Sequence, residues 1–209
     1  MGKKALAAGK LTLDRIKAGD LEPVSETIDP GEIVCLSGPS GSGKSRLLRA
    51  VADLDPHEGS VSIAGESQQD LRGHRWRRAV TMVPAESAWW FDTVGEHLPG
   101  PMTEALDQLG FKAETLDWSI DRLSSGEKQR LALVRALAHQ PRALLLDEPT
   151  ANLDPDATRE TEQWLCKVIR ERALPTLWVA HDREQIARVA DRHLHIEGDR
   201  LVKTSGDKD

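Results

Sequence analysis

The 209-residue chain has only two cysteines, and their positions argue against a disulfide framework. Cys35 lies in an apolar segment that we expect to be a buried strand, and Cys166 lies in a predicted helix. The two are not spaced as a CxxC pair, and no Cys/His cluster suggests a metal site. We therefore expect both thiols to be reduced and to serve packing.

The chain also lacks a long apolar run. No segment approaches the roughly 20 apolar residues that a membrane-spanning helix needs. The first ten residues, Met1–Lys10, carry basic side chains, but their apolar stretch is too short for a secretory signal. We therefore expect a soluble, intracellular protein, so that any role at a membrane would come through a partner.

Positive charge is in short supply. The 28 lysines and arginines are outnumbered by 34 acidic residues, and the formal net charge is −6. A general nucleic-acid binder would normally present a basic surface, so this balance argues against one. The single basic cluster is better interpreted as a solvated strand edge; its residues are Arg72, Arg75, Arg77 and Arg78.

One glycine-rich segment has the spacing of a complete phosphate-binding loop, hereafter the phosphate loop. Its residues are Gly38, Pro39, Ser40, Gly41, Ser42, Gly43, Lys44 and Ser45. The glycines let the backbone curl and present N–H groups to phosphate oxygens, Lys44 reaches the β- and γ-phosphates, and the Ser45 hydroxyl is placed to ligate Mg²⁺. The alternative, a glycine-rich surface turn, explains less of the pattern.

The flanks of this loop favour the phosphate-binding interpretation. Residues 32–37 are typical of a buried strand, and residues 45–54 predict a helix, so the phosphates would lie at a helix N-terminus. The apolar face of that helix is Leu47, Leu48, Val51 and Leu54. The sequence therefore predicts a nucleoside-triphosphate site.

Elsewhere strand patterns alternate with helical ones, which predicts a parallel sheet covered by helices. The further predicted strands are 11–14, 24–28, 59–64, 80–83, 143–146, 176–180, 193–197 and 201–203. Helical character, with loops at Leu98–Pro101 and Gly110, is predicted for about 86–139. Further helices are predicted from Pro155 to about Ala173, with Asp154 as the cap, and for 182–190. The polar C-terminal residues are predicted to be frayed.

A second motif, Leu123–Gln129, contains a capping box of Ser124 and Glu127. On its own it indicates a well-capped helix. The glycine-containing helix start also offers free N–H groups to an anion. A third motif, Leu144–Glu148, ends a buried strand in two carboxylates, where phosphate-loop enzymes hold Mg²⁺. Asp147 is then the metal-side carboxylate and Glu148 the group that polarises a water; an ordinary charged loop is the alternative.

With these motifs the chain resembles the ATP-binding cassette (ABC) ATPases, the nucleotide-binding subunits of ABC transporters. The resemblance also rests on Ala151–Asp154 and on His181, and it covers nearly the whole chain. Within the family, the short length and residues 125–131 and 177–182 are similar to small Fet-type iron-exporter ATPases. The resemblance implies a P-loop NTPase (RecA-like) α/β core with N-terminal antiparallel strands and an inserted helical subdomain. The core would comprise 1–85 and 137–209, and the insertion 86–136.

The resemblance also implies a mechanism. ATP and Mg²⁺ would bind the phosphate loop with Arg46, and Ser45 and Asp147 would hold the metal. Glu148 would act as general base and His181 would contact the γ-phosphate. In a two-fold homodimer, the partner subunit would close over each nucleotide with its signature segment, which is Ser124, Ser125, Gly126 and Glu127.

The implied setting is the cytoplasmic face of the cell membrane. There the chain would hydrolyse ATP to drive a separate integral permease, with metal or iron export as the suggested cargo and no nucleic-acid partner. Two other functions stay open: a soluble ATP-dependent switch acting on DNA, ribosomes or a protein complex, and a slow, degenerate ATPase.

The chain departs from the family pattern at several positions. Ala85 stands where a glutamine is usual, so the loop that senses the membrane partner lacks its amide, although the neighbouring Glu86 could supply an oxygen. No aromatic residue occurs in 11–28 to stack on adenine, and the chain contains no tyrosine. Arg46 and Ser125 replace a threonine and a glycine. Finally, Trp89–Phe91 either receives a helix of the permease or packs the insertion.

Overall fold

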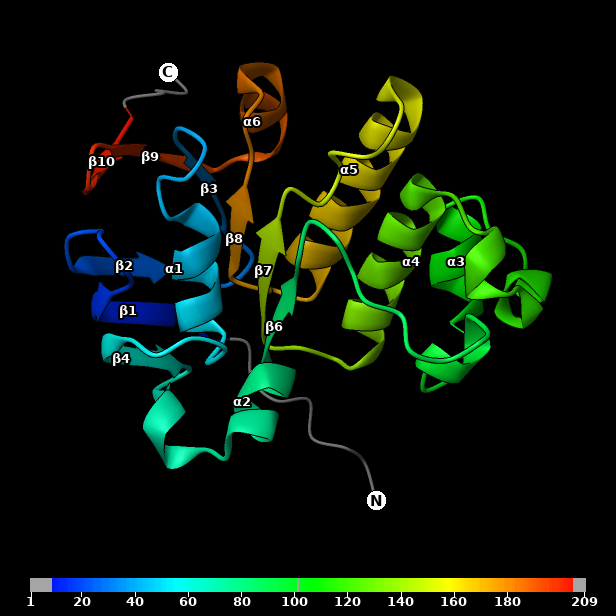
Figure 1. Cartoon of the computed structure of the whole chain (residues 1–209), viewed down its shortest axis with the longest axis horizontal. Coiled ribbons are helices and arrows are strands. Elements are labelled where there is room, and N and C mark those ends of the chain that lie inside the picture. The colour runs from blue at the N-terminus through cyan, green and yellow to red at the C-terminus, as the bar shows by residue number, and fades with distance from the viewer. Residues whose placement is uncertain (1–8, 101, 205–209) are drawn as a thin grey trace.

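The computed structural model describes residues 9–100 and 102–204, which form two β-sheets and the helices around them (Figure 1). The strands are β1 (Leu11–Lys17), β2 (Val24–Ile28), β3 (Ile33–Ser37), β4 (Glu58–Ile63), β5 (Glu66–Ser67), β6 (Val80–Val83), β7 (Ala143–Asp147), β8 (Thr176–Val179), β9 (Arg192–Glu197) and β10 (Arg200–Lys203). The α-helices are α1 (Lys44–Val51), α2 (Gly73–Ala79), α3 (Thr103–Gln108), α4 (Ser125–Ala138), α5 (Pro155–Glu171) and α6 (Arg183–Val189). Short 3-10 turns occupy Gln68–Asp70, Gly95–His97, Ala113–Asp117 and Ile120–Arg122.

The larger sheet is the parallel core that the alternating pattern predicts. Its strand order is β10-β9-β3-β8-β7-β6, and only the edge strand β10 runs antiparallel to its neighbour. Strands β3, β7 and β8 are buried at every position, as expected for strands covered by helices on both faces. The smaller, antiparallel sheet has the order β2-β1-β4-β5. The α/β core with N-terminal antiparallel strands is thus confirmed.

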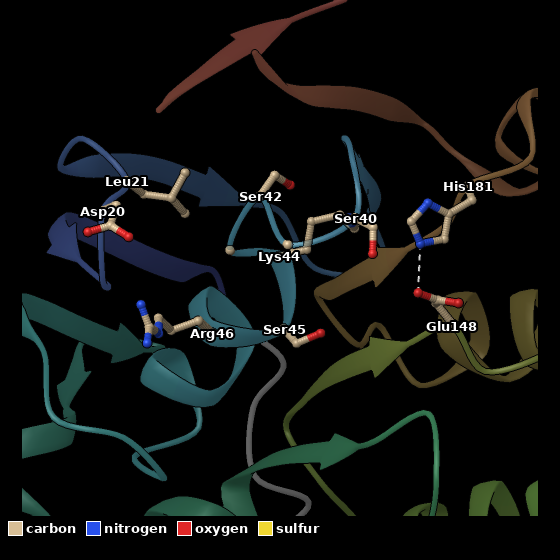
Figure 2. Close-up of a pocket in the computed structure, with 11 residues that line it drawn as sticks. Asp20, Leu21, Ser40, Ser42, Lys44, Ser45, Arg46, Glu148 and His181 are labelled. Carbon is tan, nitrogen blue, oxygen red and sulfur yellow. Dashed lines mark hydrogen bonds and ion pairs between the residues drawn. The ribbon is translucent and has the colours of Figure 1, made fainter. Parts of the chain in front are cut away.

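The order of the central strands explains where the functional residues meet. Parallel strands place their carboxyl ends at one edge of a sheet, and ligands of such sheets bind at that edge. Here β3 leads into the phosphate loop, and its neighbour β8 leads to His181. The next strand, β7, ends at Asp147 and Glu148. Segments more than 100 residues apart in sequence therefore face one another (Figure 2).

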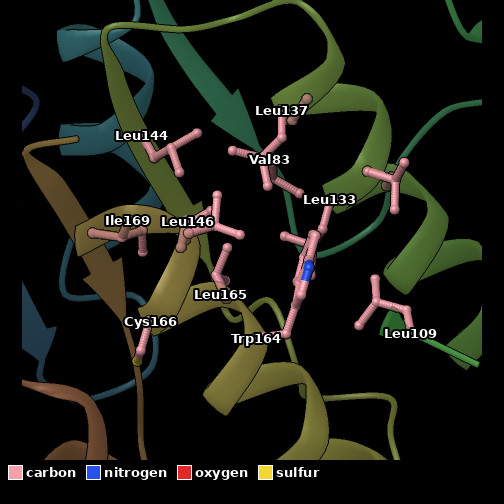
Figure 3. Close-up of a cluster of buried hydrophobic side chains, with 14 of the residues drawn as sticks. Val83, Leu109, Leu133, Leu137, Leu144, Leu146, Trp164, Leu165, Cys166 and Ile169 are labelled. Atoms are coloured by element: carbon pink, nitrogen blue, oxygen red, sulfur yellow. The ribbon is translucent and has the colours of Figure 1, made fainter. Parts of the chain in front are cut away.

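The hydrophobic core has two parts, one on each face of the larger sheet. On one side α1 packs between the two sheets, so that Leu47, Leu48 and Val51 are fully buried with residues of β1 and β4. On the other side α4 and α5 pack over β7, where Leu133, Leu146 and Trp164 lie together (Figure 3). The same layers are visible in Figure 1, with α1 on one side of β7 and β8 and α4 and α5 on the other.

Three expectations about local structure were wrong. The basic cluster is not a strand edge, because residues 73–79 form α2, whose arginines are exposed. That helix is held by Trp76, which is fully buried and donates from Nε1 to the Val51 carbonyl at 2.9 Å. The first helix ends at Val51, three residues before Leu54, which is 44% exposed.

The third error concerns residues 86–139, where the first α-helix starts only at Thr103. The preceding loop is held by the buried His97 side chain. Its Nδ1 lies 2.9 Å from the Thr93 carbonyl, and its Nε2 accepts backbone N–H groups from Trp90 and Phe91 at 3.0 and 3.1 Å. These bonds satisfy backbone groups that a helix would otherwise pair, so the loop is stable without regular structure.

The expected fraying of the last residues falls partly on 205–209, which lie outside the described residues, as do 1–8. The division into a core (1–85 and 137–209) and an insertion (86–136) stays a prediction.

Candidate functional site

The phosphate loop forms the floor of a pocket of about 400 Å³ at the carboxyl edge of the larger sheet (Figure 2). Its lining residues are Asp20, Leu21, Ser40, Gly41, Ser42, Gly43, Lys44, Ser45, Arg46, Glu148 and His181. Glu148 and His181 lie at one end of the loop, and Asp20, Leu21 and Arg46 lie at the other. The pocket therefore brings together two predicted catalytic residues and most of the predicted phosphate loop.

The backbone of the loop requires glycine where it enters α1. Gly43 has a φ of 97°, in the left-handed region that other residues rarely adopt. A Cβ there would also come within 3.1 Å of the Leu21 side chain. The first N–H groups of α1 face the pocket without intrahelical acceptors, so this turn presents donors to an anion.

Lys44 is the buried cation of the site. Its side-chain ammonium donates to the Gly38 and Pro39 carbonyls at 2.9 and 2.8 Å, so it spans the phosphate loop from within. Burial lowers the pKa of Lys44, while the nearby carboxylates of Glu148 and Asp147 oppose that shift. The neighbouring carboxylates thus favour the charged form of the amine, and a charged amine can donate strong hydrogen bonds to a phosphate.

Asp147 ends β7 beside the loop and is only 6% exposed. Burial raises the pKa of this carboxyl, and the Ser45 hydroxyl and Lys44 oppose the rise. Its Oδ1 atom is buried and has no hydrogen-bond partner among residues 9–100 and 102–204. An oxygen left without a partner next to a hydroxyl suits a hydrated Mg²⁺, which takes one or two carboxylates plus phosphate oxygens. The described residues contain no group of three or more His, Cys, Asp or Glu that could hold a metal by themselves.

Glu148 and His181 form a direct pair at the mouth of the pocket. The Nε2 atom of His181 lies 2.6 Å from Oε1 of Glu148, and the two side chains are 46% and 34% exposed. Glu148 adopts a φ of 49°, a left-handed conformation that costs energy for a residue with a Cβ. Its backbone N–H donates to the Val179 carbonyl at 3.2 Å, which holds the residue in place beside β8. The pair can share a proton and face a water or phosphate.

Sequence reasoning missed two residues of the pocket, Asp20 and Leu21. They lie in the turn between β1 and β2, and the antiparallel sheet brings them to the loop. Leu21 is buried, whereas Asp20 is exposed. Both belong to residues 11–28, which contain no aromatic side chain to stack on adenine. No periodic pattern marks such a turn, so the only signal was its position between two strands.

The signature segment lies at the start of α4 and lines no part of this pocket. Its capping box is confirmed: the Ser124 hydroxyl accepts from the Glu127 N–H at 3.2 Å, and Glu127 accepts from the Ser124 N–H at 2.8 Å. These bonds lower the pKa of the Glu127 carboxyl. Ser125 is exposed, and a Cβ on Gly126 would come within 3.0 Å of Leu153. The structure therefore separates this segment from the pocket of its own chain.

The loop after β6 carries the departures from the family pattern. Neither Ala85 nor the exposed Glu86 lines the pocket. Trp89 packs against the core and lies beneath the Arg135 guanidinium at 4.4 Å from its ring, while Trp90 and Phe91 are 64% and 48% exposed. The packing interpretation therefore holds for Trp89, whereas the interpretation as a receiving surface stays a prediction for the exposed Trp90 and Phe91.

The cysteines occupy the places that the sequence predicts. Cys35 and Cys166 are free and buried, and burial raises the pKa of Cys166 to about 11.

In residues 9–100 and 102–204, every helix is too short or too polar to cross a membrane.

Comparisons with known proteins show the family of this chain. The ABC transporter family model matches residues 21–151, more than half of the chain. The sulfate/thiosulfate import ATP-binding protein CysA of Bordetella bronchiseptica is 37% identical over 210 residues, which cover 90% of this chain and 58% of the relative. The protein of the same name from Pseudomonas aeruginosa is 39% identical over 193 residues, covering 82% and 57%.

The chain thus spans less than two thirds of the length of these relatives. Among solved structures, a bacterial Atm1-family ABC exporter with ATP bound superposes with a TM-score of 0.82 at 26% identity. That match covers 95% of this chain and 39% of the exporter chain. The phosphate loop, Glu148 and His181 line one pocket, and the family model spans more than half of the sequence, so the chain belongs to the ABC transporter family.

Proposed function

We propose that this chain binds and hydrolyses ATP to drive transport through a separate membrane permease. The observation that carries the proposal is the meeting of the phosphate loop with Glu148 and His181 in one pocket. Phosphate-binding groups and a carboxylate–imidazole pair are the parts that phosphoryl transfer to water needs. A site that only bound nucleotide would not require the carboxylate–imidazole pair.

ATP binding would use the backbone N–H groups of the phosphate loop and the Lys44 ammonium. A γ-phosphate oxygen would replace the Gly38 and Pro39 carbonyls as acceptors of Lys44, because a charged acceptor forms the stronger hydrogen bond. Arg46, at the other end of the loop, would contact the nucleotide there. Ser45 and Asp147 would hold Mg²⁺, which supplies charge neutralisation at the phosphates when it is bound.

Hydrolysis would use the Glu148–His181 pair. The Glu148 carboxylate would orient a water and accept its proton. The His181 N–H, which faces that carboxylate in this structure, would turn to donate to the γ-phosphate when nucleotide binds. Their separation of 2.6 Å already couples the two side chains, so small displacements of either segment would change both roles.

The signature segment would act in trans. It lies outside the pocket of its own chain, yet its helix start offers N–H groups to an anion. Two copies related by a two-fold axis could each close the partner's nucleotide, because a two-fold interface is self-complementary. We propose such a homodimer with two ATP molecules between the subunits.

The membrane partner would bind near the exposed aromatic pair Trp90 and Phe91. Large exposed apolar side chains often mark interaction sites, and Arg135 holds the adjoining Trp89 in place. The proposed location is therefore the cytoplasmic face of the membrane, and no nucleic-acid partner is proposed.

The direction of transport is not part of the proposal. Resemblance to Fet-type exporters predicted metal or iron export, but the curated relatives carry the names of sulfate/thiosulfate importers and the solved structure is that of an exporter. Because these names disagree, they support neither a direction of transport nor a cargo for this chain.

The decisive experiment measures hydrolysis of Mg-ATP by the purified chain and by Glu148→Gln. We expect wild-type turnover and a loss of roughly 100-fold or more in kcat, with nucleotide binding retained, because the amide cannot accept the proton. Normal turnover by Glu148→Gln would show that the catalytic assignment is wrong.

A slow, degenerate ATPase is the second candidate, and Ala85 is the observation that favours it. Its methyl group offers no oxygen, and Glu86 next to it lies outside the pocket. The same assay on Ala85→Gln separates the two: an almost inactive wild type that glutamine restores would support degeneracy. Equal turnover by both proteins would exclude it.

A further inference from the structure

A hydrogen-bonded cluster outside the pocket joins the two segments that carry Glu148 and His181. Gln185, one turn into α6, donates from Nε2 to the Thr150 hydroxyl at 2.7 Å and to Oε1 of Glu162 at 2.8 Å. Arg188, on the same helix, donates to both oxygens of Glu162, at 2.9 and 3.2 Å. These four residues are hereafter the α5–α6 clamp.

The clamp surrounds a buried carboxylate, Glu162, and its hydrogen bonds are part-buried. The Glu162 side chain is 4% exposed and Thr150 is 6% exposed, whereas Arg188 reaches the surface at 39%. Three donated hydrogen bonds and one cation compensate the buried carboxylate, so removing any donor leaves an acceptor without its partner. A buried, satisfied network of this kind fixes the relative positions of the elements that supply it.

Those elements are the ones that place the catalytic pair. Thr150 lies two residues after Glu148, and Gln185 lies four residues after His181. The Gln185–Thr150 bond therefore links the same two segments that the 2.6 Å contact between His181 and Glu148 links. Glu162, in the middle of α5, anchors this second link to the helical layer of the core.

The local backbone shows why a second link matters. Glu148 has a φ of 49°, which persists only where the surroundings impose it. Its side chain and that of His181 are partly exposed, and their single hydrogen bond is open to water. The part-buried bonds of the clamp involve Thr150 and Gln185, which lie two and four residues after the pair on the same segments, so they can hold a geometry that the exposed pair cannot hold alone.

We propose that Gln185 is a positioning residue for ATP hydrolysis, which holds the His181 segment against the Glu148 segment through Thr150 and Glu162. The inference rests on the proposed function and deepens it. Gln185 lines no part of the pocket. Its loss should therefore reduce the chemical step while leaving the phosphate loop and nucleotide affinity intact.

The test compares kcat, KM for Mg-ATP and the melting temperature of the purified chain and its variants. Gln185→Leu removes the donors at similar volume, and Thr150→Val removes the acceptor hydroxyl. We expect each to lower kcat roughly 10- to 100-fold, since misplacement by about 1 Å can cost that much, with KM changed by less than about twofold. Thr150→Ser, which keeps the hydroxyl, should retain most activity.

The controls separate positioning from stability. Gln163→Leu makes the same chemical change at an exposed position of α5 and should leave kcat unchanged. The double variant Gln185→Leu/Thr150→Val should lose no more than the worse single variant, because both remove one link. If Gln185→Leu does not fold, the contrast between Thr150→Val and Thr150→Ser decides.

Several results would overturn the inference. Wild-type kcat in Gln185→Leu or in Thr150→Val would do so, as would losses in the double variant that simply multiply, or a rise in KM that matches the fall in kcat. If the wild type and the variants are all active, the role of the clamp is refuted and the proposed function stands. If the wild type is inactive, the proposed function and the role of the clamp are both refuted.

Discussion

At the residue scale, the site holds a buried carboxyl whose ionisation is unfavourable. Asp147 is largely removed from water at the end of β7, and that burial raises its pKa above the reference value of 3.8. The Oδ1 atom of Asp147 is also buried, and no described residue donates a hydrogen bond to it. Burial therefore makes the charged form of Asp147 less favourable than in water, and a bound cation or donor would offset that cost.

Asp147→Asn should stabilise the nucleotide-free chain at neutral pH. A carboxyl with a raised pKa in the folded state contributes stability below pH 3.8, and that contribution is lost as the pH rises through the folded-state pKa. Asparagine removes the cost of the ionised form, so we expect a gain of about 2 °C in melting temperature near neutral pH. Thermal unfolding followed by circular dichroism should show the gain shrinking as the pH falls toward 3.8. A lower melting temperature for the variant at neutral pH would contradict this account.

At the element scale, helix α5 contributes residues to both the hydrophobic core and the α5–α6 clamp. Its N-cap Asp154 accepts from the Asp156 and Ala157 N–H groups at 3.1 and 3.0 Å, and Pro155 occupies the first helical position. One face carries the fully buried Leu165 against β7 (Figure 3), and the neighbouring Glu162 serves the clamp. Local capping starts the helix, while packing against the sheet supplies most of its stability.

Leu165→Ala should therefore cost about 2–5 kcal/mol of unfolding free energy, from the lost apolar burial and the cavity left behind. Urea unfolding at fixed pH measures the change, with Lys167→Ala on the exposed face of α5 as the matched control. The control should stay within about 0.5 kcal/mol of the wild type. A similar, small change in both variants would show that the face of α5 contributes little.

At the scale of the whole molecule, one chain carries two complementary half-sites, which lie apart from each other. The phosphate loop with Glu148 and His181 forms a pocket, and the exposed signature segment lies elsewhere on the surface. A second copy is the simplest way to bring the two halves together. ATP would then act as part of the interface, and its hydrolysis would remove contacts that hold the dimer.

The Glu148→Gln chain should therefore dimerise when ATP and Mg²⁺ are added, because it binds nucleotide without consuming it. Size-exclusion chromatography with light scattering should report twice the monomer mass with ATP and the monomer mass with ADP. Adding Ser125→Glu should abolish the dimer, since a carboxylate would face the partner's phosphates. The control Ala113→Glu places the same charge at another exposed position and should leave dimerisation intact. A monomer under every condition would refute the proposed arrangement.

Sequence patterns accounted for the features that depend on neighbours in the chain. The phosphate loop needs glycines and a lysine at fixed spacing, the capping box needs Ser124 and Glu127 three residues apart, and buried strands such as β7 need continuous apolar runs. Each was predicted because its physical cause lies within a few residues. The bounds were less exact: β1 continues beyond Asp14 through an irregularity in its pairing with β2, which an alternation pattern cannot anticipate.

Features that depend on contacts between distant residues were not predicted, because their physical cause lies outside the local sequence. Asp20 and Leu21 reach the pocket because the antiparallel sheet packs beside α1, and α2 exists because Trp76 is buried beneath it. The α5–α6 clamp joins Thr150, Glu162 and Gln185 across 23 and 35 positions of sequence. No local pattern distinguishes these side chains from solvated ones.

The sequence by itself determined that the chain binds a nucleoside triphosphate, since the phosphate loop is made of local backbone turns and one lysine. It also determined the alternation of strands and helices, through side-chain periodicity. Only the tertiary structure decided that the carboxyl ends of β3, β8 and β7 adjoin, which brings Glu148 within 2.6 Å of His181 and leaves the signature segment apart. The physical reason is that strand order and helix packing are set by the burial of whole faces, which joins residues that are distant in the chain.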